Sequence, residues 1–124
     1  TDEDVSTLRK YVELSKAGMK EGDRLCVLKN DREMHMYLAQ MTKNKFIIPE
    51  LERIRDFLDW LILFKRARMM EALSEHDRLI ECLSLRDTKG AVKAIRQHIN
   101  NALQSTLDSL KADQPQQATE GQDT

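Results

Sequence analysis

The three histidines, which are the only ones in this 124-residue chain, each lie on the apolar line of a predicted helix. His35 follows Asp31 by four residues, about one helical turn, so the two side chains point the same way. His76 and His98 lie on two later helical segments. Imidazole and carboxylate groups are costly in an apolar core unless they are paired or coordinated. The sequence therefore predicts a single buried metal site formed by these four side chains.

The composition is typical of an all-α helical bundle: 40% of the residues are apolar, 33% are charged, and only four are Gly and two Pro. The 20 basic and 21 acidic residues are interspersed and form no basic stripe, which argues against nucleic-acid or membrane binding by these residues. No apolar run approaches the roughly 20 residues that span a bilayer. The chain opens on Thr1-Asp2-Glu3-Asp4, unlike a signal peptide, and Cys26 and Cys82 form no CxxC motif. We therefore expect a cytoplasmic location.

The apolar spacing predicts five helices and no strand, at about 4–17, 24–42, 49–64, 69–85 and 88–110. The third segment is the most apolar, so we expect it to run through the core and to offer one side to a partner subunit. Residues 111–124 contain no bulky apolar side chain and are typical of a disordered tail.

Neutral imidazoles with one carboxylate suit a divalent ion. We expect Zn first, with Ni, Mn, Co or Fe as alternatives. The HExxH motif is absent, and so is the Glu-x-x-His signature of di-iron bundles. Glu33 and Glu75 flank two of the histidines, and we interpret them as solvent-facing or supporting residues rather than catalytic bases.

Two segments resemble a known family, the FCD domain, which is the effector-binding domain of FadR-type regulators in the GntR family. The segment DREMHMYLAQMTKN, from Asp31 to Asn44, is similar to the family pattern D-x-x-F-H-x-x-L-A-x-x-S-x-N. Residues 75–99 are similar to E-H-x-x-I-x-x-A-[LI]-x-x-x-D-x-x-x-A-x-x-x-[ML]-x-x-H-[IL]. Met34 stands where the family usually has Phe, and Thr42 where it has Ser.

The resemblance implies an antiparallel bundle of six or seven helices that binds a divalent metal and senses a small carboxylate such as a hydroxy acid, a dicarboxylate or a sugar acid. By position, the metal ligands are Asp31, His35, His76 and His98. Residues 1–110 would form the ligand-binding and dimerisation domain. The family's N-terminal winged-helix DNA-binding domain and the first helix of its effector domain would precede this chain.

Three residues are candidates for contacting the effector. Asn44 matches the family's Asn after the D-x-x-F-H helix, although it also suits the end of that helix. Arg55 and Arg66 lie on or beside the inward face of the third segment and could receive a carboxylate; a solvated or subunit-bridging role fits them as well.

These patterns favour the effector-sensing domain of a bacterial transcriptional regulator, which would act as a homodimer, reach DNA through the winged helix, and catalyse no reaction. Two alternatives stay open. A small metal-dependent hydrolase or isomerase would use Glu33 or Glu75 as its base. A purely structural helical module would bind no metal.

Overall fold

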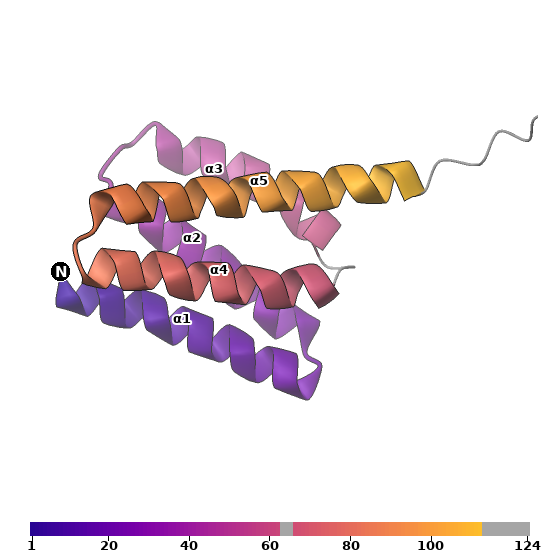
Figure 1. The fold of residues 1–124 in the computed structure, drawn as a ribbon, viewed down its shortest axis with the longest axis horizontal. Coiled ribbons are helices and arrows are strands. Elements are labelled where there is room, and N and C mark those ends of the chain that lie inside the picture. Colours follow the sequence, from indigo (N-terminus) through magenta and orange to yellow (C-terminus); the bar gives the residue numbers. More distant parts are fainter. Residues whose placement is uncertain (63–65, 113–124) are drawn as a thin grey trace, which may run out of the picture.

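The computed structural model describes the backbone of residues 1–62 and 66–112 and the side chains of 1–59 and 67–112. Within these residues the chain forms five α-helices and no strand, which confirms the predicted all-α class. The helices are α1 (Asp2–Glu21), α2 (Arg24–Met41), α3 (Ile47–Ile62), α4 (Arg66–Ser84) and α5 (Thr88–Ala112) (Figure 1). Helix α5 extends two residues into the predicted tail, and residues 113–124 of that tail lie outside the described residues.

Helix α1 ends at Glu21 rather than at about residue 17, where the apolar spacing predicted its end. Gly18, just after the predicted end, lies inside the helix and is buried. A Cβ atom at Gly18 would lie only 3.1 Å from Val27 Cγ2, so the missing side chain lets α2 approach. The helix is capped by Gly22, whose φ of 73° is the left-handed conformation that glycine adopts at little cost.

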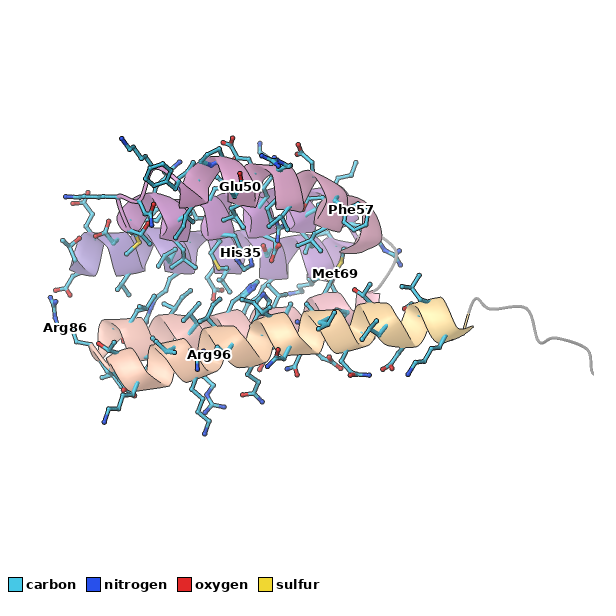
Figure 2. The ribbon with its side chains drawn as sticks, turned by 90° about the horizontal axis from the view of Figure 1, so that it is seen from above. His35, Glu50, Phe57, Met69, Arg86 and Arg96 are labelled. Carbon is cyan, nitrogen blue, oxygen red and sulfur yellow. The ribbon has the colours of Figure 1, made fainter. Side chains whose placement is uncertain are left out.

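The five helices form two layers (Figure 2). Helix α1 packs against α2, and α3 packs on the other side of α2. Helices α4 and α5 form the second layer, and α1 also packs against α4. His35, on α2, lies where the first layer faces the second. None of the five described helices combines the length and the apolar character that crossing a membrane requires.

The core is formed by apolar residues of α1, α2, α4 and α5, whereas no described side chain of α3, which was expected to run through the core, belongs to either of its clusters. One cluster joins α1, α2 and α4 and contains Leu8, Val12, Met34, Leu73 and Ile80. A second cluster, between α4 and α5, contains Leu79, Ala91 and Ala94. The two alanines are small, so α4 and α5 approach each other closely along this part of the bundle.

Helix α2 buries more than one stripe of its surface. Leu25, in its first turn, is 68% exposed, whereas Val27, Met34, Met36 and Ala39 are buried. Helix α2 packs against both α1 and α3, so its buried arc is wider than a single apolar stripe.

Candidate metal centre

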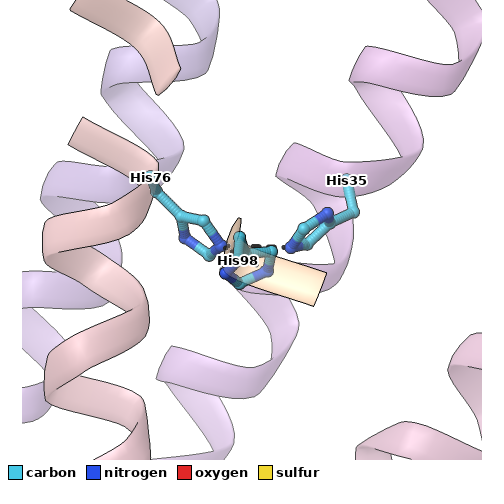
Figure 3. Close-up of side chains that lie close together, drawn as sticks. All are labelled: His35, His76 and His98. Carbon is cyan, nitrogen blue, oxygen red and sulfur yellow. Dashed lines mark hydrogen bonds between the residues drawn. The ribbon is translucent and has the colours of Figure 1, made fainter. Parts of the chain in front are cut away.

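Each of the three histidines comes from a different helix, and their rings meet in the interior (Figure 3). His35 Nε2 lies 3.1 Å from His76 Nε2, which in turn lies 3.3 Å from His98 Nε2. One nitrogen from each ring falls within 4.8 Å of the others. The structure thus brings together the three side chains that the helical pattern placed on inward faces.

Local sequence explains why these rings can meet. His76 is buried on α4 between the apolar side chains of Leu73 and Ile80, on the face that α1 and α2 cover. On α5, Ala91 and Ala94 precede His98 by seven and four residues, which places all three on the same helix face. Their small side chains allow the close approach of α5 that His98 requires.

Asp31 lies beside the cluster, one turn before His35. Its Oδ1 atom is 3.7 Å from His35 Nε2 and 3.6 Å from His76 Nδ1, slightly beyond hydrogen-bonding distance of both rings. Its Oδ2 atom accepts a hydrogen bond from Arg55 on α3. The carboxylate therefore adjoins the rings of His35 and His76 without being bonded to either. It does not belong to the group of donor atoms that lie within 4.8 Å of one another, and its role as a fourth ligand stays a prediction.

The environment keeps two of the rings neutral and the carboxyl group ionised at pH 7. Burial lowers the pKa of His35 to about 4 and that of His76 to about 3, from an ordinary value of 6.5. Burial alone would raise the pKa of Asp31, but its interactions with His35, Arg55 and His76 outweigh that effect and lower it to about 2. Neutral imidazole and ionised carboxylate are the forms that bind metal ions.

The contacts among the Nε2 atoms fit a shared cation better than hydrogen bonding alone. An imidazole nitrogen has one in-plane position, which holds either a hydrogen or a lone pair, so it makes one well-directed hydrogen bond. His76 Nε2 nevertheless has two close nitrogen neighbours. Nitrogens bonded to one Zn²⁺ at about 2.1 Å lie roughly 3.0–3.4 Å apart for octahedral to tetrahedral angles. The distances of 3.1 and 3.3 Å fall in that range.

A network of polar residues on the outer side of His98 was missed by sequence reasoning. Glu75 Oε1 lies 2.9 Å from His98 Nδ1, and the same carboxylate binds Arg68 and Asn101. Glu75 was interpreted as a solvent-facing or supporting residue, or as the base of the alternative enzyme, with no partner assigned to it, and Arg68 and Asn101 were not considered. The available signal was spacing: Arg68 and Glu75 are seven residues apart, and Asn101 follows His98 by three, so each pair shares a helix face.

The three candidate effector contacts have different positions. Arg55 is only 4% exposed and binds Asp31 and Asp59, so it adjoins the cluster but already has partners. Asn44 lies in the exposed turn after α2, where its Oδ1 accepts a hydrogen bond from the backbone N–H of Phe46. That contact is local to the turn that leads into α3, which begins at Ile47, so it neither ends α2 nor faces the histidine cluster. The side chain of Arg66 lies outside the described residues.

Residues 1–101 match the family model of the FCD domain, so the chain belongs to the FCD domain family. This is a regulatory, effector-sensing domain of transcription factors. No curated protein and no solved structure matches the chain.

Proposed function

We propose that this chain is the effector-sensing domain of a bacterial GntR-family transcriptional regulator of the FadR subfamily. It binds one divalent metal ion, Zn before Ni, Mn, Co or Fe, through Asp31, His35, His76 and His98. The observation that carries the proposal is the convergence of three imidazole nitrogens from three helices. Membership of the FCD family supports the sensing role.

The position of the centre suggests how sensing would reach the rest of the molecule. His35 belongs to the layer of α1, α2 and α3, whereas His76 and His98 belong to the layer of α4 and α5. A metal ion held there would supply a Lewis-acidic position for an oxygen ligand such as a carboxylate. Because the donors come from both layers, an effector that favours one spacing of the layers would shift the protein toward that arrangement.

A small carboxylate is the effector class that best suits the surroundings. Arg55 adjoins Asp31 and is buried, and its Nε atom has no hydrogen-bond partner among the described residues. A guanidinium group binds carboxylates with good geometry. An effector carboxylate could therefore reach the centre and Arg55 together, in partial exchange for the contact between Arg55 and Asp31.

The two candidate catalytic bases favour sensing over catalysis. Glu33 is exposed on α2, so its carboxylate faces solvent rather than the histidine cluster. Glu75 is bound by Arg68, His98 and Asn101, so its oxygens are already occupied by donors. A general base has to be free to reach the proton that it removes from a substrate.

We propose that the functional unit is a homodimer whose parent protein reaches DNA through a winged-helix domain. Helix α3 supports the dimer, since Ile54 and Phe57 are large apolar side chains that it exposes. Sedimentation velocity at micromolar concentration should then give the mass of two chains, and a monomer at all concentrations would exclude this arrangement.

The proposed function is tested by the metal content of purified wild-type protein, the His76→Ala variant and a Glu33→Gln control. We expect about one divalent ion per chain in the wild type and the control, and almost none in His76→Ala, because that variant loses the central donor. The zinc-loaded protein is then heated with a panel of hydroxy acids, dicarboxylates and sugar acids, at least one of which should raise the Tm. Wild-type protein that stays metal-free after reconstitution would contradict the proposal.

A further inference from the structure

One carboxylate contacts His98 on the side opposite the histidine cluster. His98 Nε2 faces His76 Nε2 at 3.3 Å, and His98 Nδ1, on the other side of the ring, lies 2.9 Å from Glu75 Oε1. Glu75 is on α4, directly before His76, and its side chain is mostly buried. The imidazole of His98 is therefore held between the candidate metal centre and a carboxylate.

Other donors fix the position of that carboxylate. Arg68, one of the few buried cations, binds it with two parallel hydrogen bonds: Nη1 to Oε2 at 2.9 Å and Nη2 to Oε1 at 2.6 Å. Asn101 Nδ2 donates to Oε2 at 2.8 Å. All three of these bonds suit an ionised carboxylate, because the Arg68 and Asn101 nitrogens donate and leave the two Glu75 oxygens as acceptors. Glu75 is thus an anion at pH 7 that can only accept hydrogen bonds.

The direction of the contact with His98 follows from the partners of Nδ1. Two groups approach this nitrogen: Glu75 Oε1 at 2.9 Å, which can only accept, and Arg68 Nη2 at 3.4 Å, which can only donate. If Nδ1 carried a lone pair, that lone pair would face the carboxylate at the shorter distance. Arg68 Nη2 has better acceptors in Glu75 Oε1 and in the carbonyl oxygen of His98, at 3.2 Å. Nδ1 therefore carries the hydrogen and donates it to Glu75.

We propose that Glu75, held by Arg68 and Asn101, is the positioning residue of His98: by accepting the Nδ1–H it leaves the lone pair of neutral His98 on Nε2, aimed at the other two histidines. The inference rests on the proposed function, because orientation of Nε2 matters only where that atom binds a metal. Carboxylates that accept from the second nitrogen of a ligand histidine fix its tautomer and raise its basicity.

The tautomer is measured directly on metal-free wild-type protein by nitrogen-15 NMR of the histidine rings above pH 7. We expect His98 to carry its hydrogen on Nδ1, so that Nδ1 and Nε2 give the signals of a protonated and an unprotonated ring nitrogen. A hydrogen on Nε2 instead would overturn the proposal, and this measurement needs no variant that might fail to fold.

The consequence for metal binding is measured by zinc titration of the wild type against a chelating indicator, beside Glu75→Gln and two controls. Glu75→Gln keeps the shape of the side chain but loses its charge, and should weaken zinc binding by about 10–100-fold. Glu71→Gln makes the same change one turn earlier, at an exposed residue 3.5 Å from Arg68, and should bind zinc as the wild type does. Asn101→Ala loses a bond to Glu75 Oε2 but keeps the contact of Oε1 with His98, so it should affect stability more than zinc affinity.

The outcomes separate this proposal from the one on which it rests. Wild-type protein that binds no zinc defeats the proposed function, while the NMR result still decides whether Glu75 sets the tautomer. Wild-type protein that binds zinc, with Glu75→Gln binding equally well, defeats the positioning role alone. An equal loss of affinity in Glu75→Gln and Asn101→Ala would show that the network only stabilises the fold, and would also overturn the proposal.

Discussion

His76 shows at the scale of one residue what the buried site costs the protein. Its side chain is almost completely buried, and burial lowers its pKa to about 3, so the ring stays neutral in the fold. His35 follows the same rule, with a pKa of about 4. In the unfolded chain both rings would take up a proton near pH 6.5. Protonation of these rings therefore stabilises the unfolded chain, whereas a metal ion bound to the neutral rings would stabilise the folded protein.

We predict that the chelated, metal-free protein loses stability as the pH falls from 7 to 5. Below pH 6.5 His35 and His76 are protonated in the unfolded chain, whereas in the folded protein they stay neutral down to about pH 4 and 3. The unfolded chain therefore binds two more protons, and the free energy of unfolding decreases as the pH falls. The loss should total roughly 2–4 kcal/mol by pH 5. Asp31 and Glu75, whose pKa values are lowered to about 2, add a further loss below about pH 4.5.

Urea unfolding curves at pH 7, 6 and 5 measure this dependence. His76→Gln should lose about half of it, because one of the two groups with a lowered pKa is gone. Stability that stays constant or increases between pH 7 and 5 would show that the two rings are not buried as neutral groups.

At the scale of the helix, the spacing of neighbouring residues predicted features that depend on neighbouring residues, namely the helices themselves. Apolar spacing placed all five helices, and it gave the start of α2 after its N-cap Asp23, but it ended the first helix at about residue 17 rather than before Gly22. Contacts between residues that are far apart in the sequence were harder to predict. Arg68 follows a run of basic residues typical of an exposed helix end, and it is buried because Glu75, two turns later, and the carbonyl oxygen of His98 accept its hydrogen bonds.

The candidate metal centre shows the same contrast between features of one helix, which were predicted, and contacts between helices, which were not. The three histidines were predicted correctly as inward-facing because each lies on an apolar stripe of its own helix. The partner of Arg55 could not be predicted, because its contact with Asp31 depends on how α3 packs against α2. The polar network around Glu75 joins α4 to α5, and sequence spacing within one helix does not reveal which residues of the next helix it meets.

We predict that Gly22→Ala destabilises the hairpin of α1 and α2 by about 1 kcal/mol. No atom lies within 4 Å of the added Cβ, so the whole cost is the left-handed backbone conformation, with φ at 73°. The urea midpoint at pH 7 measures the change, and Glu21→Ala, an exposed neighbour, is the control and should stay close to wild type. A Gly22→Ala variant as stable as wild type would mean that the helix ends differently.

At the scale of the molecule, the candidate metal centre lies where the two helical layers meet. Helices α2, α4 and α5 each supply one histidine, so the centre joins parts of the chain that are far apart in sequence. The same arrangement leaves the outer face of α3 exposed, with Ile54 and Phe57 on it. A regulator domain requires both features: a site whose occupancy alters the spacing of layers, and a surface through which a second subunit responds.

The proposed function requires that His35, His76 and His98 bind one metal ion together. Zinc-edge X-ray absorption of the reconstituted wild-type protein counts imidazole ligands, because the rings give a characteristic scattering pattern beyond the first coordination shell. We predict three imidazoles and at least one oxygen around each zinc, with nitrogen at about 2.0–2.1 Å. A zinc ion with one imidazole or none would show that it is bound elsewhere, and that the three histidines are ordinary buried residues of the core.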